Sequence, residues 1–411
     1  MFNPQKFNNQ EFIAKLNIFF VASYLLISVL NTPFILKIFF YSISLILLIH
    51  AGGLKKSLVR GFTSYYPYLI FTIICIFSFI IFSSSNYIDG DRPKIENIVA
   101  LLIYFIFLNQ FQNYYINIFD LLLKITSVFL IISLPIHVFY YESLFLTASS
   151  FLYAFDNIDF SAKNTFGVYL SFLLPFSIYK LSKKFSIYNY LITLLLSVSI
   201  YYTFSRTALI LSTIAILILI LSRKKSLVAA CVLLISSILL LLFIFQINFT
   251  KYNDLKVESH RQVLNNPEWE TENINKSFTL NSSRAEYIFN ALEGFNKKPF
   301  FGHGLSHFKK DHSYFDKDGR HIRNPVTHND YAQILYELGI IGIISFLYLF
   351  YFNFKNSFKF HCNDRTLLKL NFINIFLLFI SLNAINLIDH PLFWIIMALT
   401  LPKKNKVIKN N

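Results

Sequence analysis

Long apolar runs separated by short polar segments follow one another along most of the chain. About 20 helical residues cross the hydrocarbon core of a bilayer, which is ~30 Å thick. The runs are continuous rather than alternating, which favours helices over a membrane barrel. The pattern therefore predicts an all-α integral membrane protein with twelve helical spans, at residues 12–31, 33–51, 65–84, 96–111, 118–140, 162–181, 186–204, 206–222, 226–248, 331–354, 366–387 and 389–402.

These spans divide the chain into three parts. Residues 1–248 hold the first nine spans, residues 249–330 form one large hydrophilic loop, and residues 331–411 hold the last three spans and a basic tail. The first apolar run is long, lacks a small-residue cleavage site and is followed at once by another run, so we expect no cleavable signal peptide.

The composition supports a membrane protein and argues against a soluble one. Of the 411 residues, 55% are hydrophobic and only 14% are charged, and the mean hydropathy is +0.52. A soluble domain of this size would expose too much apolar surface with such a composition. Three cysteines lie in or beside the spans without a pairing pattern, and we predict neither a disulfide nor a metal site from Cys75, Cys231 and Cys362.

The net charge of +15 raises the question of nucleic acid binding, which the distribution of the charge answers. The basic residues gather in alternate connections between spans, the positive-inside pattern of a twelve-span protein with both termini in the cytoplasm. We therefore expect no nucleic acid partner. The segments that carry this excess follow spans two, six, eight, ten and twelve: Lys55, Lys56 and Arg60; Lys180, Lys183 and Lys184; Arg223, Lys224 and Lys225; Lys355, Lys359, Arg365 and Lys369; Lys403, Lys404, Lys406 and Lys409.

The large loop lies outside the cytoplasm if this topology holds, and its second half predicts an amphipathic helix. Ser283 and Glu286 form a capping box, and Pro299 ends the helical pattern. Such a helix would lie on the membrane surface or against the bundle. Arg284 falls in its first turn, where backbone N–H groups and a guanidinium together favour a phosphate. The alternative is an ordinary solvated arginine paired with a neighbouring carboxylate.

Arg206 interrupts a stretch that is otherwise apolar from Tyr188 to Leu221. A charge at membrane depth costs about 2.5–3.5 kcal/mol on insertion scales and commonly marks a functional site. Arg206 also lies at the outer end of its span, where the positive-inside pattern does not place an arginine. The alternative is an arginine whose side chain reaches the lipid headgroups.

His328 directly precedes the tenth span in the sequence "VTHND". Thr327 as N-cap and Asp330 near the positive end of the helix account for a plain helix start, but they leave the histidine unexplained. A histidine titrates near neutrality and accepts a proton from a hydroxyl at the edge of a dry site. Asn329 would orient it or bind a sugar hydroxyl, and Asp389 is a further candidate on the same face, with helix capping as its alternative.

Other motifs point away from cofactors. The loop histidines include an i, i+4 pair, His303 and His307, but an intervening glycine and nearby lysines argue against zinc, and we predict no metal. The glycines near them follow no strand and form no nucleotide fingerprint. Gly339 and Gly342 are typical of close helix packing within a span.

Taken together, these motifs resemble the O-antigen ligase and polymerase superfamily, bacterial integral membrane enzymes that take a glycan from undecaprenyl pyrophosphate. The matching residues are a Ser-Arg pair between two spans, an arginine at the start of a loop helix, a Pro-Phe-x-Gly-x-Gly stretch, and a His-Asn pair before Glu-x-Gly-x-x-Gly: Ser205 and Arg206; Arg284; Pro299 to Gly304; His328 and Asn329 with Glu337, Gly339 and Gly342. In the first half only the number of spans and an asparagine ahead of span six, Asn164, agree.

The resemblance implies that Arg206 and Arg284 grip the pyrophosphate and that His328 activates the acceptor hydroxyl, without metal, nucleotide or other cofactor. It implies an enzyme of the bacterial inner membrane with a periplasmic site, whose partners are the lipid-linked glycan, a lipid A core or other glycan acceptor, and membrane lipids. An O-antigen ligase is the first interpretation and an O-antigen polymerase the second. A protein O-oligosaccharyltransferase and a transporter of lipid-linked sugars remain open.

Overall fold

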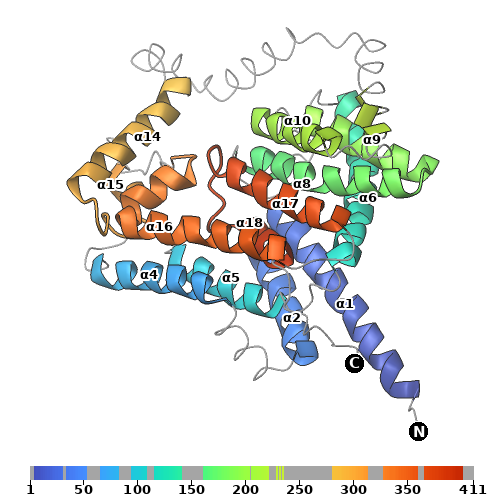
Figure 1. Cartoon of the computed structure of the whole chain (residues 1–411), viewed down its shortest axis with the longest axis horizontal. Coiled ribbons are helices and arrows are strands. Elements are labelled where there is room, and N and C mark those ends of the chain that lie inside the picture. The colour runs from blue at the N-terminus through green and yellow to red at the C-terminus, as the bar shows by residue number, and fades with distance from the viewer. Residues whose placement is uncertain are drawn as a thin grey trace.

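The computed structural model describes residues 4–30, 34–52, 65–82, 94–108, 115–140, 161–203, 205–221, 280–312, 327–359 and 365–400, together with 228–229, 231–232 and 234–235. Every regular element in these residues is a helix, which confirms the predicted all-α class (Figure 1). The helices are α1 (Pro4–Val29), α2 (Phe34–Gly52), α4 (Tyr66–Phe82), α5 (Lys94–Leu108), α6 (Tyr115–Tyr140), α8 (Ser161–Lys183), α9 (Ile187–Tyr202), α10 (Arg206–Leu221), α14 (Leu280–Lys297), α15 (His307–His312), α16 (Asp330–Lys359), α17 (Arg365–Ser381) and α18 (Pro391–Thr400).

A helix stands at eleven of the twelve predicted spans. The predicted ninth span, at 226–248, lies mostly outside the described residues, and the first part of the large loop and the basic tail lie wholly outside them. Within the described ranges, one helical stretch, Asp330–Ser357, is both long and apolar enough to cross a membrane, and eight shorter apolar helices accompany it. The helices are thus where the apolar runs predict them, and the twelve-span membrane bundle stays a prediction.

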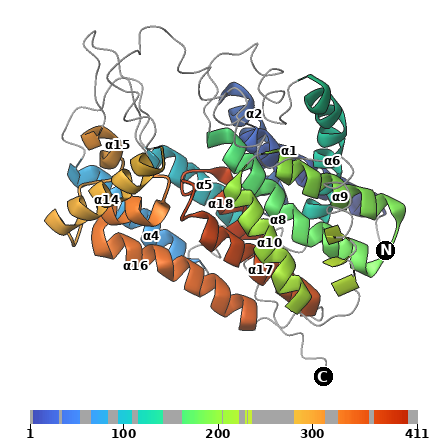
Figure 2. The same cartoon turned by 90° about the horizontal axis from the view of Figure 1, so that it is seen from above.

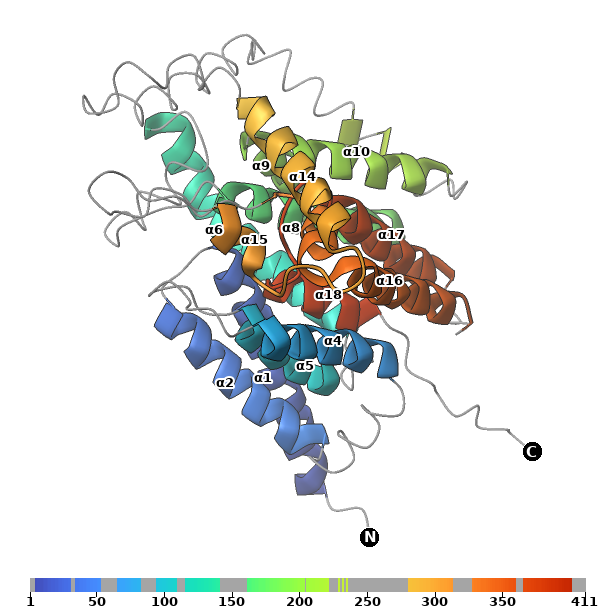
Figure 3. The same ribbon diagram turned by 90° about the vertical axis from the view of Figure 1, so that its left-hand side faces the viewer.

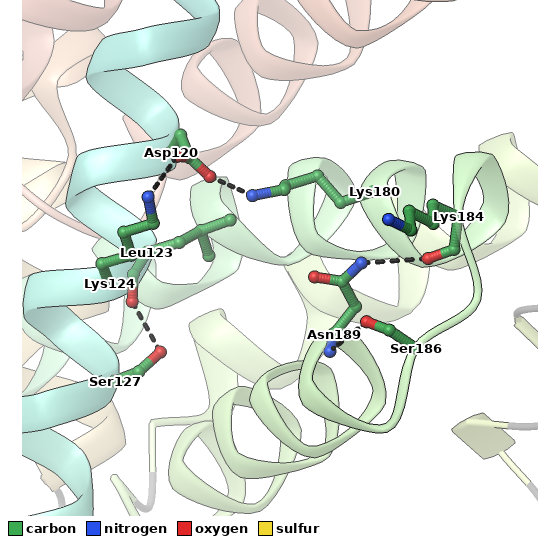
Figure 4. A network of polar contacts seen from close by, with 8 residues as sticks. All are labelled: Asp120, Leu123, Lys124, Ser127, Lys180, Lys184, Ser186 and Asn189. Atoms are coloured by element: carbon green, nitrogen blue, oxygen red, sulfur yellow. Dashed lines mark hydrogen bonds and ion pairs between the residues drawn. The ribbon is translucent and has the colours of Figure 1, made fainter.

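Contacts between helix ends sort the ends into two sets. In one set, the start of α16 binds the residues after α17, and His390 before α18 contacts the carbonyl of Ser28 near the end of α1. In the other set, Asp120 near the start of α6 pairs with Lys124 and with Lys180 near the end of α8 (Figure 4). A twelve-span protein would place the first set outside the cytoplasm and the second inside.

A break divides α16, the helix whose start belongs to the first set. Gly339 has φ 66° and ψ −160°, a non-helical conformation that divides α16 into two segments. Ile340 N and Ile341 N donate to the carbonyls of Pro299 and Phe300 instead of to their own helix. The carbonyls of Tyr336 and Glu337, which would have accepted those bonds, accept from His303 N and Gly304 N. Four loop bonds therefore replace two helical ones.

The Pro-Phe-x-Gly-x-Gly stretch and the glycine motif in α16 therefore bind each other. Residues 299–304 and 336–341 together form one joint. A Cβ on Gly302 would lie 2.5 Å from the carbonyl carbon of Glu337, and one on Gly339 would lie 2.5 Å from that of Phe300. Both glycines also have φ near 67°, so close approach and backbone conformation each require glycine. The prediction that Gly339 and Gly342 mark helix-to-helix packing was wrong for Gly339, which breaks the helix. A Cβ on Gly342 would meet Leu338 of α16 itself rather than another helix.

Helix α14 starts at Leu280, so Ser283 lies inside the helix and is not its N-cap. The predicted end is confirmed, since α14 stops at Lys297, two residues before Pro299. Ala291 of α14 packs with Phe308, Ala332 and Tyr336 in a small core of its own. α14 crosses in front of α16 when the molecule is seen from this end (Figure 3). The helix thus lies against the bundle, as one of the two predicted placements requires.

Candidate functional site

Arg206 opens α10 directly after a tight turn from α9. The hydroxyl of Ser205 accepts the N–H of Ala208 at 3.3 Å, which makes Ser205 the N-cap of α10. The turn rests on α8, because a Cβ on Gly167 would lie 2.8 Å from the Cβ of Ala208 and 2.9 Å from the hydroxyl of Thr203. Ser205 is buried and holds the turn, while the side chain of Arg206 is exposed.

The position of Arg206 favours binding of an anion. The first turn of an α-helix carries backbone N–H groups without helical acceptors and the positive end of the helix dipole. Arg206 adds a guanidinium at this end, and no carboxylate among the described residues pairs with it. An exposed arginine on a helix start is a suitable partner for a phosphate.

Arg284 lies in the second turn of α14 rather than in the first, because α14 begins four residues earlier than the capping box predicted. Its backbone is described and its side chain is not. Gly294 touches Tyr336, and one turn earlier Ala291 packs beside Ala332 and Tyr336. The early residues of α14 therefore lie toward the start of α16, the end that carries His328.

His328 adopts a left-handed backbone conformation, with φ 51°, and its side chain is half-buried. Asn329, not Thr327, is the N-cap of α16: its Oδ1 accepts the N–H of Ala332 at 3.0 Å. The Thr327 hydroxyl closes the turn by accepting the N–H of Asn329 at 3.2 Å. A non-glycine residue in this conformation is uncommon and is found often at functional sites. The cap thus positions His328 just outside the helix.

Asp330 fastens this helix start to the loop between α17 and α18. Its N–H donates to the carbonyl of Leu382 at 2.8 Å, and its Oδ2 accepts the N–H groups of Leu387 at 2.6 Å and Ile388 at 3.2 Å. Asp330 is completely buried. Its role goes beyond the predicted interaction with the helix dipole, because the carboxylate connects two distant segments of the chain.

Gln333, one turn further along α16, adds a second polar contact between this helix and the loop after α17. Gln333 donates from Nε2 to Glu337 at 2.9 Å, and its Oε1 accepts from the side-chain amide of Asn386. Gln333 and Glu337 are both buried. Sequence reasoning missed Gln333 and Asn386 as partners, although a Gln-x-x-x-Glu pair in an apolar run was a usable signal for a buried polar contact.

Asp389 lies half-buried in the loop after α17, and its neighbour His390 caps α18. The His390 Nδ1 accepts the N–H of Leu392 at 3.1 Å, so its Nε2 carries the proton toward the Ser28 carbonyl at 3.3 Å. Both ring nitrogens of His390 are therefore engaged in holding the start of α18 against α1. His390 is thus a cap of α18, and the role of Asp389 stays a prediction.

The loop between α17 and α18 lies between α14 and α16 on one side and α8 and α10 on the other in both Figure 1 and Figure 2. α10 also packs on α17. The segment that carries Asp389 is therefore bound directly to the start of α16, and it separates that start from the helix that Arg206 opens. The bonds of Asp330 join the α16 start, next to His328 and Asn329, to the loop of Asp389, and α10, which Arg206 opens, packs on α17.

His303, the other prominent histidine, takes a structural position. Its ring stacks on Tyr336 with centroids 4.3 Å apart, and its Nε2 contacts the Gly294 carbonyl at 2.9 Å. The Tyr336 hydroxyl donates to Asp311 at 2.6 Å. In the part of the chain that the structure describes, no three His, Cys, Asp or Glu side chains gather closely enough to hold a metal ion.

Comparison with known proteins adds a family to this geometry. The family model described as O-antigen ligase matches residues 191–347, a range that contains Arg206, Arg284, His328 and the joint at Gly339. A comparison with curated proteins returned no match. Residues 191–347 are therefore similar to an O-antigen ligase domain, which supports the resemblance to the O-antigen ligase superfamily.

Proposed function

We propose that this protein is an O-antigen ligase-type glycosyltransferase that moves a polysaccharide from undecaprenyl pyrophosphate to a hydroxyl of the lipid A core. The superfamily consists of membrane-associated, glycosyltransferase-like enzymes. The observation that carries the proposal is the family match over 191–347, since all three residues that the reaction needs fall inside it. The exposed Arg206 at a helix start and the left-handed His328 outside a capped helix support the roles given below.

In the proposed reaction, the acceptor oxygen forms a bond to the anomeric carbon as the bond from that carbon to the pyrophosphate oxygen breaks. Negative charge develops on the leaving pyrophosphate, so guanidiniums fixed around it stabilise the transition state more than the bound donor. Arg206 and Arg284 take this role. Because the hydroxyl attacks from the side opposite the leaving group, the anomeric centre is inverted.

His328 accepts the proton of the attacking hydroxyl. The hydroxyl is far less acidic than an imidazolium, so the proton moves as the new bond forms, a contribution of about 10²- to 10⁴-fold in rate. The Asn329 cap fixes the start of α16, and the Asp330 carboxylate holds that start, with the preceding His328, against the loop between α17 and α18. Asn329 and Asp389 are the proposed supporting residues, and neither metal nor nucleotide takes part.

The proposed setting is the inner membrane, with twelve spans, both termini in the cytoplasm and the site on the periplasmic side. The two sets of helix ends support this topology, because ends expected on one side contact one another. The part of α16 after Gly339, Ile340 to Lys359, is long enough to cross the hydrocarbon core at 1.5 Å per residue. α14 and α15 then form the periplasmic part.

Purified protein tests the proposal directly. The assay supplies a lipid-linked glycan and lipid A core without ATP and with a metal chelator present. Transfer to the core supports a ligase. Product that forms only on a second lipid-linked unit instead identifies a polymerase, and the absence of transfer to either acceptor contradicts a glycosyltransferase.

A further inference from the structure

A groove lies beside the joint, on the side of the molecule that α4 covers. It has a volume of about 190 Å³ and is lined by α4, by the turn after α14 and by both sides of the break in α16, through Ile73, Phe77, Ile81, Phe301, Leu338 and Ile341. This volume is below the ~300–1,000 Å³ of pockets that enclose a drug-sized molecule. The groove therefore accommodates a segment of a single chain rather than a whole ligand.

The residues that line the groove determine what kind of molecular segment it can bind. Ser78 is its one polar side chain, and the Ser78 hydroxyl already accepts the N–H of Leu305 at 3.1 Å. The other walls are aliphatic or aromatic, so nothing in the groove compensates a buried polar group of a ligand. A hydrocarbon segment fits these walls.

The walls are also open to the surroundings. Ile73, Phe77 and Phe301 are 60%, 58% and 58% exposed. Ile70 and Ile80 extend the same apolar surface along α4. Large contiguous apolar surfaces mark sites of interaction with a protein or a membrane, and this one continues along a helix predicted to face lipid. A chain already in the bilayer thus has lateral access to the groove.

A cation stands at the rim. The Lys298 ammonium lies 5.6 Å from the centroid of the Phe82 ring, which is part of the groove wall. Lys298 is exposed and forms no ion pair with any other residue that the structure describes. Its neighbour Lys297 differs, because it pairs with Glu293 at 2.8 Å, and this hydrogen bond holds the pKa of Glu293 below its usual value.

We propose that the groove and Lys298 form a binding site for an anionic phospholipid, with one acyl chain against Phe77 and Phe301 and the phosphate beside Lys298. The apolar walls supply chain binding, and the Lys298 ammonium supplies headgroup selectivity. The site is separate from the residues proposed for transfer and does not depend on that function. A lipid bound here would contact both sides of the joint that joins α14 to α16.

Native mass spectrometry of the full chain in detergent tests the site, with phosphatidylglycerol and phosphatidylcholine of identical acyl chains as probes. Phosphatidylglycerol should bind more tightly. Lys298→Ala should weaken its binding about fivefold, as expected for one basic residue near an anionic headgroup, and should leave phosphatidylcholine unchanged. Lys297→Ala is the matched control and should alter neither lipid.

Phe301→Ala should weaken both lipids, because it removes part of the shared apolar wall. All three side chains are exposed, and equal melting temperatures will show that the variants fold. Equal effects of Lys297→Ala and Lys298→Ala, or no preference for phosphatidylglycerol, would overturn the proposal. Undecaprenyl phosphate displacing phosphatidylglycerol with the same dependence on Lys298 would overturn the assignment to a phospholipid and identify a carrier lipid instead.

Discussion

Substituting Gly339 by Ala tests whether the joint holds α14 and the start of α16 in place. Gly339 has φ 66° and ψ −160°, a region that is essentially restricted to glycine and costs another residue about 1–3 kcal/mol. The new Cβ would also lie 2.5 Å from the carbonyl carbon and oxygen of Phe300. Carbon atoms in contact are normally ~3.5–4.0 Å apart, so residues 299–304 must move away.

That movement breaks the two bonds that the second segment of α16 donates, from Ile340 to Pro299 at 2.8 Å and from Ile341 to Phe300 at 3.4 Å. Each contributes about 1 kcal/mol. Together with the backbone strain, the loss is about 3–5 kcal/mol. For 411 residues this corresponds to a melting temperature about 4–6 °C lower, because the entropy of unfolding scales with chain length.

Thermal denaturation of purified protein in detergent, followed by size-exclusion chromatography, measures this shift. Ile344→Ala is the control, since Ile344 lies on α16 beyond the break and is 61% exposed. It should leave the melting temperature nearly unchanged. A Gly339→Ala protein as stable as the control would refute the reasoning, because an alanine would then fit a backbone and a contact that exclude it.

Three other changes give separate tests. Asp330→Ala should destabilise the protein by about 2–4 kcal/mol in the same thermal assay, because two buried N–H groups lose their acceptor. Asp330→Asn should cost less, since its amide oxygen still accepts a hydrogen bond. Equal losses in the two variants would contradict the role of the Asp330 carboxylate as the acceptor. Arg206→Lys should retain only part of the transfer rate, because an ammonium lacks the guanidinium fork, and Arg206→Ala should retain almost none. Both variants should keep the melting temperature of the unchanged protein. Full activity in the alanine variant would exclude the pyrophosphate role. His328→Ala should lower the rate of transfer by about 10²- to 10⁴-fold in the purified assay, because the attacking hydroxyl loses its proton acceptor, while donor binding stays the same. Normal transfer by a well-folded His328→Ala protein would defeat the proton-acceptor role.

The positions of the helices were predictable because each follows from a local property, a continuous apolar run. The end of α14 was predictable for the same reason, since Pro299 disfavours a helix in the residue before it whatever surrounds it. Its start was not, because the Ser283–Glu286 signature also occurs inside a helix when earlier residues continue the pattern. Arg284 consequently lies one turn further from the helix start than predicted.

The joint and the polar contacts around Asp330 could not be predicted, because they depend on distant parts of the chain. Residues 299–304 and 336–341 meet through backbone groups, which leave no trace in the sequence beyond the glycines. Asp330 binds backbone N–H groups of residues 387 and 388, and no side-chain pattern indicates that pairing. Asn329 and Thr327 are both good N-caps, and only the geometry of the turn distinguishes them.

The central claim is that Arg206, Arg284 and His328 meet in one site on the outer face. Cysteine cross-linking measures this most directly, in a chain whose native cysteines are replaced, with the pairs Arg206→Cys with His328→Cys and Arg284→Cys with His328→Cys and a short bifunctional maleimide. We predict that both pairs cross-link in membranes, and that each single cysteine reacts with an impermeant maleimide from the periplasmic side. Failure of both pairs to cross-link, or labelling of the three positions from opposite sides of the membrane, would contradict the account.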